Sequence, residues 1–439
     1  MLYNYYEVLL LTVLIASLVL KVTKKLFNIL MFLTITFLLL SVKSAGGDII
    51  SWEPLVKIFC VLIGVIVINS NRARIFDSSN VLILCVILAS ILMVSTTNML
   101  ALYLCIELQS LSIFILIAQE RELTSRIEAS LKYFVLSSIS SGLLLLGSSL
   151  LFIHSGSCEI TTLITQEYTP EKVLILVALL FKLAASPFHF WLPDVYQGSN
   201  NNTLLLLGTL PKISVLGIFM VLFPGNKLVL VATIFSLIIG CIGAINQSKT
   251  KRLLAYSSIV GMGFILLGIN ISSYQGIEAG TIYLTIYIIT FVSILIVINS
   301  SIDEKPTLGE LSSLLGNNLA LLSTFGILIL SVAGIPPLGG FFSKWLVLTS
   351  AITTEFIFSS ILSIICAIIA GVYYVRLVKI GYFQEEKTFL IWRKVLIKEK
   401  EMEPIQATIL GMLLYSVTFI LVCPQILWKP IHYGVLSLF

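Results

Sequence analysis

Long apolar runs separated by short polar segments occupy nearly the whole chain. A helix needs about 20 consecutive apolar residues to cross the hydrocarbon core of a bilayer. About fourteen runs approach that length, and in lipid a helix satisfies all of its own backbone hydrogen bonds. The pattern therefore predicts an all-α polytopic membrane protein with about fourteen transmembrane helices. The predicted helices lie near residues 5–22, 26–42, 54–70, 80–97, 99–118, 131–153, 173–192, 203–223, 228–246, 252–270, 278–300, 317–350, 357–380 and 407–428.

Two of the runs contain helix-breaking residues. Pro187 interrupts 173–192, and Pro336-Pro337 interrupts 317–350, which is too long for one plain span. Proline removes a backbone donor and clashes with the preceding turn, so such breaks survive in a membrane only inside protein or beside water. The two broken helices are five apart in the series, and a tandem unit of five helices must alternate in direction. The spacing predicts two inverted five-helix repeats with a transport path near the midplane.

The repeats divide the chain into four predicted parts. Helices one to three occupy 1–79, the first repeat 80–227 and the second repeat 228–383. The remaining 384–439 holds a charged loop and the last helix. The stretch 384–406 alternates in charge, and we interpret it as a solvated loop.

Lysine and arginine are unevenly distributed over the connections. Segments after odd-numbered helices carry most of them, including Arg72, Arg74 and Lys249, whereas segments after even-numbered helices carry few, such as Lys172. Basic residues mark the cytoplasmic side of a membrane protein. One face should therefore border the cytoplasm or the mitochondrial matrix, with both termini on the opposite side.

The composition agrees with a membrane location and argues against metal, cofactor and nucleic-acid binding by this chain. Hydrophobic residues make up 58% of the chain and charged residues 11%, against about 25% in soluble domains. The basic residues are scattered, so we expect the lipid bilayer as a partner and no nucleic acid. No Cys-x-x-Cys pair, Cys/His cluster or nucleotide-binding glycine loop is present, so we expect neither a metal nor a cofactor in this chain.

Four ionisable residues lie inside apolar runs: Glu107, Lys182, Lys212 and Lys344. Each costs about 2.5–3.5 kcal/mol at the bilayer centre on insertion scales, so they should face the bundle interior. Burial disfavours the charged form of a lysine, and a nearby carboxylate favours it. A buried carboxylate followed by lysines can therefore pass protons along if water links them, and these four are the candidate site.

Structural roles fit the same residues. In this alternative, Lys212 and Lys344 would extend their side chains to a membrane interface. Glu107 and Lys182 would form a static salt bridge. Lys132 begins a predicted helix and fits an interfacial anchor, and His189 lies near the end of a span. We keep Lys132 and His189 as secondary candidates.

Several motifs resemble one family of membrane proteins. The segment 182–198 reads KLAASPFHFWLPDVYQG, and 334–344 reads GIPPLGGFFSK. Further matching segments are 107–111, 128–134, 210–213 and 251–259. In this order they resemble the antiporter-like, proton-translocating membrane subunits of respiratory complex I, and within them the subunit 2 family.

The resemblance implies a function. Glu107 and Lys182 would form the carboxylate–lysine pair of a first half-channel, Lys212 the central relay and Lys344 the second half-channel. The chain would be a non-redox subunit of NADH:ubiquinone reductase (H+-translocating), beside other membrane-arm subunits that include further antiporter-like ones. FMN, iron–sulfur clusters, NADH and ubiquinone would belong to the rest of the complex. Its location would be the mitochondrial inner membrane or, alternatively, a bacterial cytoplasmic membrane.

Some positions depart from the family pattern. The stretch 198–203 lacks the usual Ser/Pro/Thr character, Gly261 stands near a position where relatives often carry histidine, and Phe114 stands where tyrosine is common. Two other functions stay open at this point: a stand-alone cation/proton antiporter, and a structural membrane subunit with an inactive channel.

Overall fold

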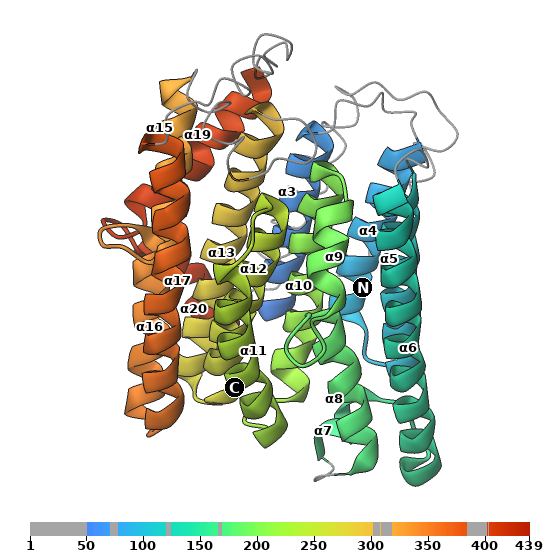
Figure 1. The fold of residues 1–439 in the computed structure, drawn as a ribbon. Helices are drawn as coiled ribbons and strands as arrows, with labels where there is room; N and C mark the ends of the chain where they lie inside the picture. The colour runs from blue at the N-terminus through green and yellow to red at the C-terminus, as the bar shows by residue number, and fades with distance from the viewer. Residues whose placement is uncertain are drawn as a thin grey trace. The chain divides into compact units, whose positions relative to one another are not determined.

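The computed structural model describes residues 51–70, 78–119, 124–165, 169–301, 308, 318–383, 402 and 404–439. Within these residues every regular element is a helix (Figure 1). The predicted helices 5–22 and 26–42, and most of the loop 384–406, lie outside the described residues. The all-α class predicted from the apolar runs is confirmed for the part described.

The first helices are α3 (Trp52–Ser70), α4 (Ser78–Ser95), α5 (Met99–Ala118), α6 (Thr124–Ser155), α7 (Ile160–Thr165), α8 (Pro170–Lys182), α9 (Trp191–Gly198) and α10 (Asn201–Leu222). The later ones are α11 (Lys227–Ile245), α12 (Thr250–Asn270), α13 (Tyr274–Ser301), α15 (Leu319–Ala333), α16 (Gly339–Thr353), α17 (Ile357–Phe383), α19 (Pro404–Phe419) and α20 (Gln425–Leu436). Among the described residues, eight helices are long and apolar enough to cross a membrane.

The end of the chain differs from the prediction of one helix over 407–428. Helix α19 stops at Phe419, a turn follows, and α20 starts at Gln425. Pro424 accounts for the interruption, because it has no N–H to donate to the carbonyl four residues earlier, its ring clashes with that carbonyl, and proline is well suited to the start of a helix. The prediction of a single span there was wrong.

The first compact unit comprises the described parts of 1–184, 202–224 and 429–439. Helices α3, α4, α5, α6 and α8 pack in this order, each on the next. Backbone bonds also join the start of α5 to the segment before α7: Met99 N donates to Cys158 O, and Ile160 N donates to Thr97 O. Trp52 ties α3 to α10, because its indole N–H donates to Gly217 O.

The second unit comprises the described parts of 185–201 and 225–428. Helices α12 and α13 form its centre, because side chains on nearly every side of both are buried, whereas α17 leaves one face open. Small residues let the two central helices approach closely: a Cβ on Gly268 would lie 2.8 Å from Gly280 Cα. This is the close packing that small residues allow between helices in membranes.

Both proline-containing runs are interrupted. Helix α8 ends at Lys182 and α9 begins at Trp191, with Pro187 in the turns between them. Helix α15 ends at Ala333, where Gly334 takes the left-handed conformation with φ +86°, and α16 begins at Gly339. A glycine fits here because other residues are strained at positive φ. Each break therefore places the end of one helix and the start of another within a predicted membrane span, where backbone N–H and C=O groups lack helical partners.

The α15–α16 break leaves no room for a side chain at Gly340. A Cβ there would lie 1.7 Å from Ser331 O, so Gly340→Ala must push two backbone segments apart. Ordinary overpacking costs about 1–3 kcal/mol. We expect a loss of at least about 3 kcal/mol in the free energy of unfolding, because the clash is with backbone.

Thermal unfolding of the purified protein in mild detergent measures this loss. Gly371→Ala on α17 is the matched control, because a Cβ at Gly371 meets nothing within 4 Å. The control should unfold at or above the temperature of the original protein, since alanine favours helix over glycine by up to about 1 kcal/mol. Equal behaviour of the two variants would contradict the tight break.

Candidate functional site

Lys344 lies at the α15–α16 break. Its Nζ donates to Val332 O at 3.0 Å and to Ala333 O at 2.8 Å, and it lies 5.7 Å from the centroid of the Phe264 ring. These carbonyls belong to the last turn of α15, where no further helical N–H is available to them. The helix C-terminus also carries partial negative charge that favours a cation. The ammonium is thus bound inside the second unit at the break, which does not fit the snorkelling alternative.

Glu107 and Lys182 lie in the first unit. Glu107 is on α5, and its Oε2 accepts from Ser110 Oγ at 3.4 Å. Lys182 is the last residue of α8, and its Nζ is buried with no hydrogen-bond partner among the described residues. The two charges interact electrostatically, and Glu107 also interacts with Tyr133. The structure thus brings the predicted pair into one neighbourhood without the close hydrogen bond that a static salt bridge would have.

Lys212 follows Pro211 within α10, which continues through the proline. Its side chain is 2% exposed, so it does not reach an interface. The helices that carry Glu107 and Lys212 are linked directly, because Gln109 Nε2 donates to Ser214 Oγ at 3.4 Å. Polar bonds of this kind hold transmembrane helices in register.

The two secondary candidates have different surroundings. Lys132 on α6 is 40% exposed and pairs with Glu128 at 2.6 Å, one helical turn earlier. An exposed pair of this kind contributes little to stability and fits an interfacial anchor. His189 is buried, its ring packs 4.6 Å from that of Phe190, and its Nδ1 has no hydrogen-bond partner in the described part of the chain.

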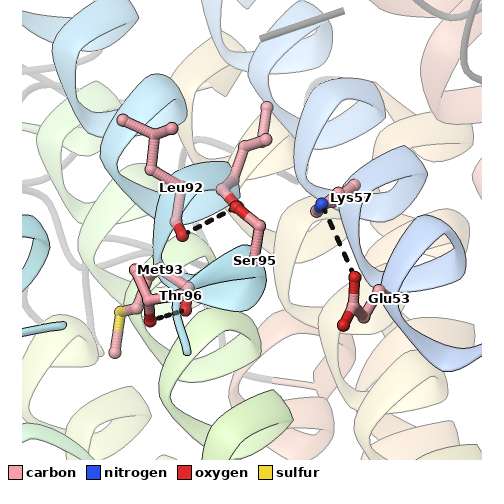
Figure 2. A network of polar contacts seen from close by, with 7 residues as sticks. Glu53, Lys57, Leu92, Met93, Ser95 and Thr96 are labelled. Atoms are coloured by element: carbon pink, nitrogen blue, oxygen red, sulfur yellow. Dashed lines mark hydrogen bonds and ion pairs between the residues drawn. The ribbon is translucent and has the colours of Figure 1, made fainter. Parts of the chain in front are cut away.

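The structure also buries a lysine that the sequence analysis did not single out. Lys57 on α3 is 2% exposed and lies 3.9 Å from Glu53, one turn earlier (Figure 2). The hydroxyls of Ser95 and Thr96 donate to carbonyls of α4, the helix beside α3. Lys57 lies within the predicted helix 54–70, so a search of that span for charges would have found it.

A second missed residue is Glu278 on α13. Its carboxylate is 7% exposed and accepts a hydrogen bond from the indole N–H of Trp428 on α20. Glu278 stands at the first position of the predicted helix 278–300, and a residue at such a boundary can face either water or protein.

Polar contacts join α9 to the start of α12 in the second unit. Lys251 Nζ donates to Ser199 O at 2.7 Å, and Arg252 pairs with Asp194 at 2.7 Å. We call this group the α9–α12 polar end. Asp194 belongs to the motif 182–198, and Lys251 and Arg252 belong to the motif 251–259. The α9–α12 polar end therefore joins two motifs that are far apart in the sequence.

The arrangement provides titratable groups within an apolar interior. Each buried ammonium can release and regain a proton, and its charge depends on nearby charges and dipoles. Within the described residues, no group of three or more His, Cys, Asp or Glu side chains is placed to hold a metal ion. The buried lysines and Glu107 can take part in proton transfer between side chains.

Comparison with known proteins agrees with the motifs. Residues 96–370 match the model of the transmembrane family described as NADH:quinone oxidoreductase/Mrp antiporter. The chain is 42% identical to NADH-ubiquinone oxidoreductase chain 2 of Metridium senile, over 83% of this chain and 98% of that protein. It is 35% identical to NADH-quinone oxidoreductase subunit N of Pelagibacter ubique, over 79% of each.

The fold is also shared with solved structures. A chain of respiratory complex I from Thermus thermophilus with bound aureothin superposes with a TM-score of 0.85, at 24% identity, over 99% of this chain and 100% of that one. A chain of the Mrp complex from Dietzia gives 0.84 at 19% identity, over 100% and 97%. At these identities the likeness concerns the fold, whereas the family match and the relatives above rest on sequence. This chain is a multi-pass membrane protein that belongs to the NADH:quinone oxidoreductase/Mrp antiporter transmembrane family.

Proposed function

We propose that this chain is a proton-translocating membrane-arm subunit of a respiratory NADH:ubiquinone oxidoreductase. The observation that carries the proposal is the Lys344 ammonium, bound to the carbonyls of a broken helix inside an apolar bundle. Supporting it, the relatives from Metridium senile and Pelagibacter ubique are named as subunits of such enzymes. Electron transfer, with FMN, iron–sulfur clusters and ubiquinone, would belong to other subunits.

Proton movement in this proposal follows changes of charge. A charge on Glu107 stabilises the ammonium of Lys182, because opposite charges nearby favour each other's ionised form. Loss of that charge would release a proton toward Lys212 and from there toward Lys344. Each proton moved against 100 mV costs about 2.3 kcal/mol, and quinone reduction elsewhere in the complex would supply it.

The finer architecture is part of the proposal. We infer about fourteen helices with inverted repeats over 80–227 and 228–383, flanked by 1–79 and 384–439. The interruptions after Lys182 and Ala333 support the repeats. We place the chain in the mitochondrial inner membrane. Both termini would lie opposite the matrix, because basic residues gather in the odd-numbered connections. A bacterial cytoplasmic membrane is the alternative.

A second candidate is a stand-alone cation/proton antiporter, because the description of the matched family also includes Mrp antiporters. The complex I proposal is preferred, because the sequence relatives that cover most of this chain are named as subunits of NADH oxidoreductases.

We expect the chain to migrate on a native gel within a large particle that has NADH dehydrogenase activity. Gentle solubilisation of native membranes, followed by an in-gel activity stain and mass spectrometry, identifies its partners. Other membrane-arm subunits, including antiporter-like ones, should be among them. A chain that migrates alone or with a few small membrane proteins, without NADH activity, would favour the antiporter.

Replacing Lys212 by methionine should abolish proton pumping and leave assembly intact, because methionine fills a similar volume without a titratable group. Membrane vesicles that hold the variant as the only copy of this subunit would be given NADH, and proton uptake followed with a pH-sensitive dye. Lys227→Met is the control, because Lys227 is exposed at the start of α11 and has no assigned role. Wild-type pumping by Lys212→Met would rule out the relay, and failure to assemble would indicate a structural role.

A further inference from the structure

Five tyrosines of the second unit form a buried group that the proposed function does not use. They are Tyr196 on α9, Tyr283 and Tyr287 on α13, and Tyr373 and Tyr374 on α17, here called the tyrosine cluster. All five are buried among apolar helices. A buried hydroxyl costs free energy unless it is hydrogen-bonded, and phenylalanine would fill the same space without that cost. The hydroxyls therefore need an explanation beyond packing.

The rings lie against the central helix α12. A Cβ on Gly261 would lie 3.2 Å from the Tyr287 ring and 3.9 Å from that of Tyr283, so the absent side chain makes room for both. Phe264, one turn along α12, stacks on Tyr283 with ring centroids 5.5 Å apart. On α17 the rings of Tyr373 and Tyr374 lie 4.4 Å apart. Helices α9, α13 and α17 thus all direct tyrosines at the same helix.

Two serines of α12 lie beside the hydroxyls. Ser258 is near the hydroxyls of Tyr196 and Tyr287, and Ser257 is near that of Tyr374. Each serine donates its own proton to a carbonyl one turn earlier, at 2.7 Å for Ser258 and 2.8 Å for Ser257. Their oxygens therefore stay available as acceptors.

Two members of the cluster have unused hydrogen-bonding capacity. The hydroxyls of Tyr196 and Tyr373 are buried and meet no partner in hydrogen-bond geometry within the described residues. Tyr196 lies beside Ser258, and Tyr373 beside Tyr374, each short of that geometry. An open series of donors and acceptors of this kind can rearrange, whereas a fully satisfied network is fixed.

The cluster has chemically distinct ends. At one end, Tyr196 lies on α9, the same helix that carries Asp194 of the α9–α12 polar end. At the other end, Phe264 contacts both the Tyr283 ring and Lys344 Nζ. The cluster therefore lies between the helices of the α9–α12 polar end and the Phe264 ring that contacts the lysine at the break.

We propose that the tyrosine cluster conducts protons between the α9–α12 polar end and Lys344. Each hydroxyl gives its proton to the next oxygen as it receives one from the previous side, and in this proposal a water molecule carries the proton between Tyr283 and Lys344. Rotation of the O–H groups then restores the starting state, so no bond other than O–H changes and no group is oxidised or reduced. This inference rests on the proposed function and adds to it the groups that supply or drain Lys344.

Tyr287→Phe and Tyr374→Phe test the proposal, because each keeps the ring and its stacking and removes one hydroxyl. We expect NADH-driven proton uptake in vesicles to slow by about tenfold or more, since a positioned proton-transfer group commonly contributes a larger factor than this. The slowed rate should also show a larger kinetic isotope effect in D2O. Assembly on native gels should be unchanged.

The matched control is Tyr382→Phe, which removes a hydroxyl of α17 that donates to Leu322 O at 3.2 Å, outside the cluster. It should pump as the original protein does. Ser258→Ala is an independent variant, because it removes an acceptor and leaves every ring in place, and it should slow uptake as the tyrosine variants do.

The outcomes distinguish the proposed function from the role of the tyrosine cluster. Wild-type uptake by Lys212→Met in the same assay would overturn the proposed function itself. Loss of uptake by Lys212→Met together with wild-type uptake by Tyr287→Phe, Tyr374→Phe and Ser258→Ala would overturn only the role of the cluster. An equal loss in Tyr382→Phe would also overturn it, because the effect would then come from packing. If a tyrosine variant fails to assemble, Ser258→Ala decides.

Discussion

A helix that stops inside an apolar bundle leaves carbonyl oxygens that lipid cannot bind, and the second unit depends on how this is solved. At the end of α15 two of these oxygens accept from Lys344 Nζ. The cation thereby compensates for the break, and the break compensates for the buried cation. Either feature alone would be costly in a membrane, which is a physical reason for a lysine and a double proline to occur in one motif.

The requirement for backbone pairing also shapes the packing around the break. Gly340 has no side chain where Ser331 O approaches, and Gly334 adopts positive φ so that the last turn of α15 can close. Glycines at Gly268 and Gly280 bring α12 and α13 close together. The centre of the unit is therefore dense, and the polar groups inside it are held in defined positions.

Two of the buried lysines, Lys344 and Lys182, are held in different ways. In the second unit the ammonium of Lys344 has direct backbone partners, whereas in the first unit Lys182 Nζ interacts with Glu107 at longer range. A cation with two carbonyl bonds is held firmly, and one with only a distant carboxylate responds to that carboxylate's charge. This contrast fits a chain in which the charge state changes first near Glu107 and the proton moves between the lysines afterwards.

The apolar runs by themselves determined the helical class, the positions of most helices and the two interruptions, because lipid tolerates few other backbone conformations. Charges inside those runs were equally visible, and Glu107, Lys182, Lys212 and Lys344 could be chosen from the cost of burying them. The ends of helices were less determined, as the turn at Pro424 and the overlooked Glu278 show, since a residue at a boundary can face either water or protein.

Only the tertiary structure decided which groups meet. Sequence could not show that Lys344 binds the carbonyls of its own break, that Gln109 contacts Ser214, or that tyrosines from three helices converge on α12. Such contacts depend on the rotation of each helix about its axis. In a chain that is apolar on almost every face, hydrophobic periodicity says little about that rotation, so packing alone sets it.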